Sequence, residues 1–276
     1  CLFLPLSRQT SKVGGEVCFN QGMERARLET FCRPGAAAEQ MGAGVWRLSI
    51  PEGPAGVYRC AQLDDYHHLA RRDFAWQAPY ELGLRARVSA ADLPGTWGFG
   101  VWNDPFTASL GLGGMAARIP ALPNAAWFFY ASPPNHLALR DTHPAQGLLA
   151  ATFSAPRVPG WLLALGLPAA GLLAIPAAAR VLRKLASRLV AEDAARVGVD
   201  STEWHDYRLV WEGERCRFWV DGALALETRA APRGRLGLVI WIDNQYAAFP
   251  ADGGVGVGAL AGPAAWLEVE SHTGAF

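Results

Sequence analysis

The sequence has no excess of charge of either sign and no long uninterrupted apolar run. Lysine plus arginine and aspartate plus glutamate number 25 each, so the formal net charge is zero. Domains that bind nucleic acid need a basic surface to neutralise phosphates, so this balance argues against a nucleic-acid partner. The apolar stretch at 161–175 contains Pro168 and two glycines and is too short for a membrane-spanning helix.

Several motifs of catalysis and cofactor binding are also missing. There is no Gly-x-Ser-x-Gly nucleophile elbow, and the glycine-rich segments 111–114 and 253–258 lack the Lys-Ser/Thr of a phosphate-binding loop, so they read as turns. No pair of cysteines has the C-x-x-C spacing of a metal site. We therefore expect no cofactor and no metal.

The cysteines are odd in number and scattered: Cys1, Cys18, Cys32, Cys60 and Cys216. This pattern favours free thiols in a reducing compartment and hence a cytoplasmic or membrane-surface location. A disulfide among Cys18, Cys32 and Cys60 is the alternative. Because the first residue is Cys1 rather than methionine, a removed export signal or a lipidated Cys1 also stays open.

What the sequence does contain is a series of short apolar segments separated by turn residues. The 30 glycines and 19 prolines fit many turns, and a hydrophobic content of 51% suffices for a large core. Residues 81–89 alternate and place Leu82, Leu84, Ala86 and Val88 on one face. Further strands are predicted at 45–50, 57–62, 97–102, 126–131, 136–141, 207–213, 216–222, 236–243 and 266–271. All-β sandwiches often reach this length as one domain, so we predict a single domain over 1–276.

The middle of the chain follows a different pattern. After the apolar run and Pro176, which suits the first turn of a helix, apolar side chains recur at helical spacing. These are Val181, Leu182, Leu185, Leu189 and Val190, and the basic Arg180, Arg183, Lys184 and Arg188 lie mostly on other sides. We predict a helical insertion at 161–195. It is interpreted as a lid over a groove, as a membrane-surface contact through 161–190, or as a cap packed on the sandwich.

The segment 204–222 reads WHDYRLVWEGERCRFWVDG. It resembles the "H-x-Y-x-x-x-W … x-x-V-D-G" hairpin of family 16 glycoside hydrolases and other concanavalin A-like jelly rolls, through His205, Tyr207, Trp211, Val220, Asp221 and Gly222. GTWGFGVWND at 95–104 is similar to the family's "G-x-W-P-A-F-W" strand, and WLEVES at 266–271 is similar to its closing strand. The resemblance implies an all-β, two-sheet antiparallel jelly-roll sandwich over 45–150 and 200–271, with His205 in a structural role.

The departure from that family concerns its catalytic residues. The family cleaves glycosidic bonds with carboxylates spaced E-x-D-x-E or E-x-D-x-x-E on one strand, and in the shorter form alternation puts all of them on one face. Between residues 103 and 131 this chain has one acid, Asp104, and no glutamate. We therefore predict that standard retaining hydrolysis is absent.

Polar residues beside aromatic ones define a candidate ligand face. In the strand predicted at 236–243, Ile240 and Ile242 share one side, and Trp241 and Asp243 share the other with Gln245. An aromatic ring, a carboxylate and an amide on one face suit a concave binding groove. A carboxylate buried there needs a partner or a raised pKa, and the partner we expect is an imidazole from segment 64–68.

That segment, Asp64-Asp65-Tyr66-His67-His68, offers acid–base partners or metal ligands, or is a solvated loop. Adjacent residues of a strand point to opposite sides, so the whole set is not expected to meet at one point. The catalytic candidates are Asp243, Asp65, His67 and Asp104. The ligand-binding candidates are Trp241, Gln245, Asn244, Tyr246, Trp102, Asn103, Trp127, Tyr130 and Tyr66.

These residues leave different functions open. One is an enzyme that uses aspartate, histidine and tyrosine acid–base chemistry on a lipophilic or glycosylated small molecule in the concave groove, with the helical insertion as lid or membrane contact. Another is a non-catalytic, lectin-like module that binds a glycan or a lipid. A third is a glycoside hydrolase with displaced carboxylates. A fold of this class does not choose among them.

Overall fold

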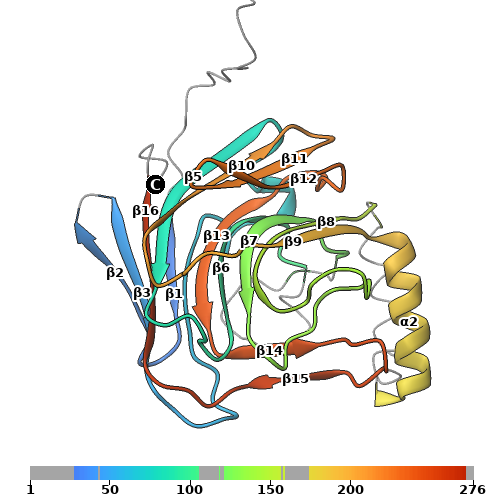
Figure 1. The fold of residues 1–276 in the computed structure, drawn as a ribbon, viewed down its shortest axis with the longest axis horizontal. Coiled ribbons are helices and arrows are strands. Elements are labelled where there is room, and N and C mark those ends of the chain that lie inside the picture. The colour runs from blue at the N-terminus through green and yellow to red at the C-terminus, as the bar shows by residue number, and fades with distance from the viewer. Residues whose placement is uncertain are drawn as a thin grey trace, which may run out of the picture.

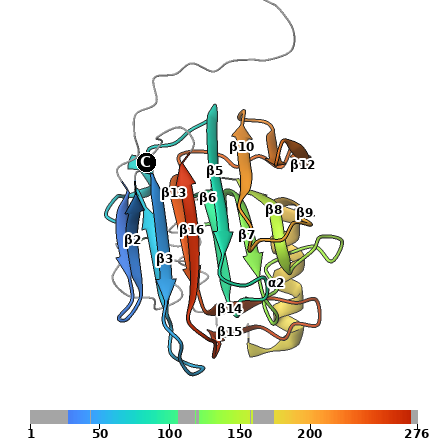
Figure 2. The same ribbon diagram turned by 60° about the vertical axis from the view of Figure 1, so that its left-hand side comes forward.

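The computed structural model describes residues 28–42, 44–105, 118, 121–156, 158 and 174–271. They form two antiparallel seven-stranded sheets packed face to face, a small hairpin below them and an α-helix at one side (Figures 1 and 2). The all-β sandwich that the sequence predicts is confirmed.

The first sheet, called sheet A, has the strand order β1-β4-β13-β6-β7-β8-β9. Its members are β1 (Glu29–Cys32), β4 (Cys60–Asp64), β13 (Gly237–Asp243), β6 (Thr96–Trp102), β7 (Ala125–Ala131), β8 (Gly147–Ser154) and β9 (Ala191–Arg196). Because β13 lies between β4 and β6, a strand from the C-terminal part of the chain is placed in the interior of the sheet.

The second sheet, sheet B, has the order β12-β11-β10-β5-β16-β3-β2. Its members are β12 (Ala223–Thr228), β11 (Cys216–Val220), β10 (His205–Trp211), β5 (Tyr80–Val88), β16 (Ala265–Ser271), β3 (Val45–Ile50) and β2 (Ala37–Gly42). The hairpin of β14 (Gln245–Ala248) and β15 (Gly256–Ala259) lies apart from both sheets at the lower edge of Figure 1.

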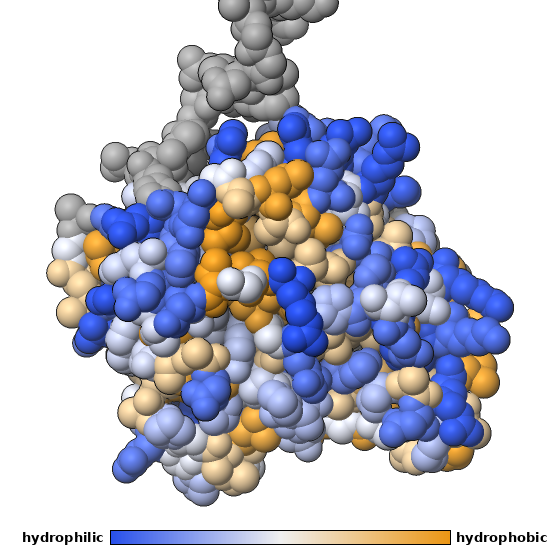
Figure 3. Space-filling model, viewed as in Figure 1, coloured by the Kyte–Doolittle hydropathy of each residue, from blue (hydrophilic) through white to orange (hydrophobic). Residues whose placement is uncertain are grey.

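The hydrophobic core lies between the two sheets. Alternation along β5 buries Leu82, Leu84, Ala86 and Val88, as the sequence predicts. Aromatic rings join the layers, for example Phe128 of sheet A, whose ring lies 5.3 Å from that of Phe218 in sheet B. Figure 3 shows that polar residues cover most of the face seen in Figure 1, while apolar residues gather near its middle.

The predicted strands at 45–50, 81–89, 97–102, 126–131, 207–213, 216–222, 236–243 and 266–271 are present within a residue or two. The strand predicted at 57–62 begins only at Cys60, and the strand predicted at 136–141 is wrong, because that segment makes a single bridge at His136. The partner of β7 is instead β8. Both faces of β8 are largely covered, so its sequence GLLAATFS shows no alternation that would reveal a strand.

The helical prediction for 161–195 is only partly correct. Residues 161–173 lie outside the described part of the chain, and the helix α2 spans Pro176–Leu189. Residues Ala191–Arg196 are strand β9, whose pairing with β8 overrides the helix-favouring composition of AEDAAR. No helix among the described residues is long and apolar enough to cross a bilayer. Cys32, Cys60 and Cys216 are free thiols, and Cys18 falls outside the described residues.

Helix α2 lies beside β9 and the end of the β14–β15 hairpin (Figure 1), and it faces the sandwich through an arginine. Arg183 is 7% exposed and donates to the carbonyl oxygens of Phe249 (2.9 Å) and Ala138 (3.0 Å). Its guanidinium also pairs with Asp141 at 2.7 Å. The apolar residues Val181, Leu185 and Leu189 point the other way and are exposed.

Candidate functional site

Alternation along sheet A sends one set of side chains into the core and the other set to the opposite side, called the outer face. In β13, Ile240 and Ile242 belong to the core between the sheets, whereas Trp241 packs with a separate cluster on the outer face. The parity predicted for this strand is confirmed. Asp243 therefore also lies on the outer face, where it hydrogen-bonds to Thr96.

The outer positions of β6 and β7, the next two strands of sheet A after β13, carry no carboxylate. On β7 they are Ala125, Trp127, Phe129 and Ala131, which form the apolar cluster of the outer face. On β6 they are Thr96, Gly98, Gly100 and Trp102. An E-x-D-x-E strand would place acids at such alternating positions. In this part of the described chain, aromatic and small residues stand there.

Two glycines of β6 let the aromatic rings lie close against the sheet. A Cβ on Gly98 would lie 2.7 Å from Cη2 of Trp241, and a Cβ on Gly100 would lie 2.5 Å from the Cβ of Trp127. The ring centroids of Trp127 and Trp241 are 5.6 Å apart, and those of Trp127 and Trp102 are also 5.6 Å apart. The result is a row of tryptophans across the middle of the outer face.

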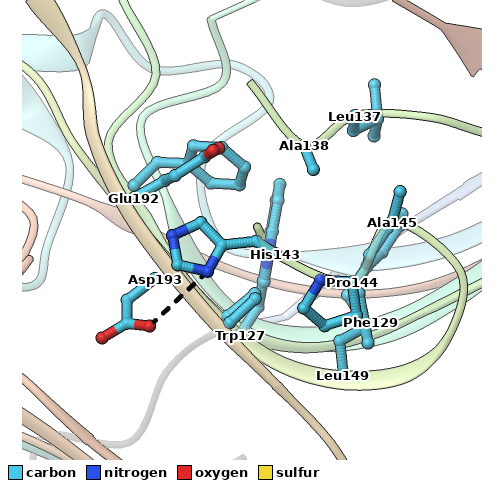
Figure 4. A pocket seen from close by; sticks show the side chains of 13 residues that line it. Trp127, Phe129, Leu137, Ala138, His143, Pro144, Ala145, Leu149, Glu192 and Asp193 are labelled. Atoms are coloured by element: carbon cyan, nitrogen blue, oxygen red, sulfur yellow. Dashed lines mark ion pairs between the residues drawn. The ribbon is translucent and has the colours of Figure 1, made fainter. Parts of the chain in front are cut away.

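This row ends in an open hollow on the outer face of β7, β8 and β9 (Figure 4). Its lining is mostly apolar and includes Trp127, Phe129, Leu137, Ala138, Pro144, Ala145, Leu149, Ala151, Phe153 and Ala194. Polar side chains stand on one side, where Nδ1 of His143 lies 4.0 Å from Oδ1 of Asp193 (Figure 4). Glu192 also lines the hollow. Its carboxylate accepts from the backbone N–H groups of Leu139 (2.9 Å) and Arg140 (2.5 Å) and thus fixes the backbone of that loop.

Asp243 is buried and hydrogen-bonded, but not to an imidazole. Its Oδ1 accepts from the hydroxyl of Thr96 at 2.8 Å and from the N–H of Gln245 at 3.1 Å, and its Oδ2 accepts from the hydroxyl of Tyr58 at 3.3 Å. Burial raises the pKa of Asp243 to about 6, against the lowering effect of these hydrogen bonds. The expected histidine partner is wrong, because hydroxyl groups from β6 and from the loop before β4 fill its place.

Segment 64–68 is a turn rather than a strand, since β4 ends at Asp64. Oδ1 of Asp64 accepts from the backbone N–H groups of Tyr66 (3.0 Å) and His67 (2.7 Å), which fixes the turn. Asp65 points elsewhere and accepts from the indole N–H of Trp76 at 2.5 Å. Burial raises the pKa of Asp65 to about 6.

Asp104 takes part in an ion pair at the end of β6. Its backbone has a φ of 45°, and its Oδ2 lies 2.5 Å from Nη1 of Arg118. Arg118 also donates to the carbonyl oxygen of Tyr66 at 2.6 Å, so the pair joins two loops. Burial raises the pKa of Asp104, while the charges of Arg118 and Arg71 oppose that shift.

Several predicted ligand-binding residues have structural contacts instead. Asn244 accepts from the N–H of Arg59 and donates to two carbonyl oxygens, and Asn103 accepts from the N–H of Asn124. Tyr130 lies on the inner side of β7, because Trp127 and Phe129 point outward, and its ring is 5.6 Å from that of Trp97. These contacts connect loops or fill the core.

The remaining predicted residues surround the tryptophan row. The buried Tyr66 accepts a hydrogen bond from the indole N–H of Trp102 at 2.6 Å. Gln245 and Tyr246 begin the β14 hairpin, where the ring of Tyr246 packs over Gly258. Of the ligand-binding candidates, Trp102, Trp127 and Trp241 are brought together on the outer face.

The four predicted catalytic residues have different partners. Asp243 contacts Thr96, Asp65 contacts Trp76, the His67 ring contacts Asp64 at 3.1 Å and Asp104 contacts Arg118. Sequence reasoning also missed most residues of the hollow: Phe129, Phe153, Leu149, His143 and Asp193. Alternation from Trp127 identifies Phe129, but the others depend on β8, β9 and a loop whose patterns do not reveal them.

A scan against protein-family models finds no match, and a search of curated proteins finds none either. Among solved structures, the chain is similar to a glycoside hydrolase family protein from Mycobacterium thermorestibile, with a TM-score of 0.47 and 12% identity over 90% of this chain and 93% of that one. It is also similar to a legume lectin-like domain from Entamoeba histolytica (0.44, 9%, 88% and 88%) and to an endo-β-1,4-glucuronan lyase from the fungus Trichoderma reesei (0.41, 14%, 92% and 92%). All three TM-scores are below 0.5, so what the outer face does follows from this chain's own residues.

Proposed function

We propose that the outer face of sheet A binds a carbohydrate in the hollow beside the tryptophan row and does not hydrolyse it by the retaining mechanism. The observation that carries this proposal is the hollow itself: aromatic side chains of β7 and β8 line it, and a histidine–aspartate pair stands at one side (Figure 4).

A sugar ring has a C–H face and a rim of hydroxyl groups, so it needs both kinds of surface. Trp127, Phe129 and Phe153 offer flat apolar rings for the C–H face. His143 and Asp193 carry donors and acceptors for hydroxyl groups on the same side of the hollow. This combination favours an amphipathic ligand with an apolar face and a polar edge.

Binding without retaining hydrolysis follows from how the carboxylates are used. That mechanism needs two carboxyl groups about 5–5.5 Å apart that flank the scissile bond. The outer positions of β6 and β7 supply none, and the carboxylate of Glu192 is held by two backbone N–H groups. The acid–base enzyme and the hydrolase with displaced carboxylates, both open from the sequence, are less well supported, because Asp243, Asp65, His67 and Asp104 have different partners.

Calorimetric titration with β-1,3- and β-1,4-linked gluco-oligosaccharides tests the proposal. Ala194→Phe fills the hollow and Phe153→Ala removes part of its floor, so each should weaken binding at least about tenfold, or about 1.4 kcal/mol. Trp219→Ala, which removes a tryptophan of sheet B, should leave affinity unchanged. Binding that survives Ala194→Phe, or retaining cleavage seen by chromatography of the products, would contradict the proposal.

A second candidate is a lipophilic small molecule, and one observation favours it: most side chains that line the hollow are apolar. An environment-sensitive alkyl-chain fluorophore distinguishes the two ligands. If the fluorophore binds, Ala194→Phe abolishes its signal and no oligosaccharide displaces it, the lipophilic ligand is the correct one. Displacement by an oligosaccharide supports the carbohydrate.

A further inference from the structure

We propose that Glu29, His67 and His68 bind a divalent transition-metal ion of the kind that imidazole ligates, with Zn²⁺ as the representative. Glu29 comes from β1 and the two histidines come from the turn after β4. One ligand atom of each side chain lies within 4.8 Å of the others. The sequence offers segment 64–68 as possible metal ligands but predicts no metal, because Glu29 stands 38 positions before His67 and no C-x-x-C spacing marks a site.

The distances between the ligand atoms fit an ion placed among them. Oε2 of Glu29 lies 3.6 Å from Nε2 of His67 and 3.3 Å from Nε2 of His68. Zinc binds imidazole nitrogen and carboxylate oxygen at about 2.0–2.1 Å, and tetrahedral geometry then separates ligand atoms by about 3.3–3.4 Å. The two distances to Glu29 therefore match tetrahedral zinc, and the exposed side chain of His68 can turn to bring its nitrogen, which lies within 4.8 Å of that of His67, to the same spacing.

The buried carboxylate of Asp64 orients the central ligand. His67 is 7% exposed, and its Nδ1 lies 3.1 Å from Oδ1 of Asp64. A carboxylate accepts hydrogen bonds, so Nδ1 carries the hydrogen and Nε2 keeps its lone pair for the ion. Metal-binding histidines commonly donate their other ring N–H to a carboxylate in this way.

The neighbouring strands hold Asp64 and Glu29 in place. The two residues are opposite each other in the β1–β4 pairing, so their side chains project from the same face of the sheet. Oδ2 of Asp64 accepts from the side-chain amide of Gln62 at 2.8 Å, while Oδ1 accepts from the backbone of the turn. Both carboxylate oxygens of Asp64 are thus fixed before any ion binds, which lowers the conformational entropy lost on metal binding.

The site is open on one side. The side chains of His68 and Glu29 are 70% and 47% exposed, whereas that of His67 is 8% exposed. Three protein ligands leave a fourth tetrahedral position for water or for an oxygen of a ligand, which is the arrangement of catalytic zinc sites. The chemistry that the ion supplies there is polarisation of that oxygen.

Titration of the full chain with Zn²⁺ by calorimetry, and with Co²⁺ by its visible absorption, tests this site. We expect one tight equivalent and the spectrum of tetrahedral Co²⁺. Glu29→Gln and His68→Ala change exposed side chains, so both proteins should fold, as far-UV circular dichroism will show, and both should lose at least tenfold in affinity. Asp64→Asn should weaken binding about 10–100-fold, because it alters the orientation of His67.

Two control variants exclude general effects of a lost charge or imidazole. Glu39→Gln on β2 and His143→Ala in the hollow lie outside the cluster, so the affinity for Zn²⁺ should not change. If the chain binds no Zn²⁺, or if binding is equal in the wild type, Glu29→Gln and His68→Ala, for instance because cysteine thiols hold the ion, the proposal is overturned.

Discussion

Asp243 is a buried carboxyl group of the outer face. It is 7% exposed, and every hydrogen bond described above comes from a neutral donor: the hydroxyls of Thr96 and Tyr58 and the N–H of Gln245. Neutral donors stabilise the carboxylate less than a cation would, so burial prevails and the pKa rises to about 6. Asp243 is thus a residue whose protonation depends on pH near neutrality.

The raised pKa makes stability depend on pH in a defined window. The folded state holds the proton up to about pH 6, whereas the unfolded chain releases it near 3.8. The stabilising contribution of protonated Asp243 to the free energy of unfolding is therefore fully present below about pH 4 and is lost as the pH rises through 6. This difference between the folded and unfolded pKa of Asp243 corresponds to roughly 3 kcal/mol of unfolding free energy.

We expect Asp243→Asn to flatten the fall in unfolding free energy between pH 4 and pH 6.5, measured by urea unfolding with tryptophan fluorescence. Part of the slope should remain, because the pKa of Asp65 is also raised to about 6. The exposed Asp92 provides the control, and Asp92→Asn should keep the wild-type slope. An Asp243→Asn profile that is parallel to the wild type would show that this carboxyl is ionised throughout.

At the scale of elements, strand β6 positions the tryptophan row by having no side chain at Gly98. A Cβ there would also lie 2.4 Å from the carbonyl oxygen of Phe128, which belongs to the neighbouring strand. Gly98→Ala should therefore displace Trp241 and destabilise the fold by about 1–3 kcal/mol. Chemical unfolding measures this, and Gly83→Ala is the matched control, because nothing lies within 4 Å of a Cβ on Gly83 of β5. Equal stability of the two variants would contradict the close contact.

Helix α2 does not bury its apolar side against the sandwich, as an amphipathic helix normally does. Its exposed side carries Val181, Leu185 and Leu189 at intervals of one turn, next to Lys184 and Arg188. Figure 3 shows apolar and polar patches side by side at the right-hand edge, where α2 lies. Of the three interpretations open from the sequence, we keep contact with an anionic membrane surface as a hypothesis, because apolar and basic groups of α2 face outward together.

The membrane hypothesis predicts a specific loss. Leu185→Ser combined with Leu189→Ser should reduce flotation with phosphatidylserine-containing liposomes several-fold, since each leucine loses apolar area that the interface would bury. Leu224→Ser on β12 is the control, because Leu224 is as exposed as Leu189, at 54% each. Equal flotation of the double variant and the wild type, or no flotation of the wild type, would contradict the hypothesis.

At the scale of the whole molecule, alternation and turn chemistry suffice to predict the sandwich. They fail where a strand has both faces covered, as in β8, and where pairing outweighs composition, as in β9. The same limits explain which residues of the candidate site could be predicted from the sequence. Parity correctly places Trp241 and Asp243, but the hollow is built by β8, β9 and a loop, and the cluster around Glu29 depends on a strand pairing that no local pattern reveals.

The central claim is that a carbohydrate binds on the outer face of sheet A, and tryptophan indole N–H signals test it most directly. In a ¹⁵N-labelled protein titrated with a gluco-oligosaccharide, the indole signal of Trp127 should shift in proportion to ligand occupancy, and that of its ring neighbour Trp241 should follow. The signals of Trp219 and Trp266, which belong to sheet B, should stay in place. Shifts confined to the sheet B tryptophans, or no shift with any oligosaccharide at millimolar concentration, would contradict the account.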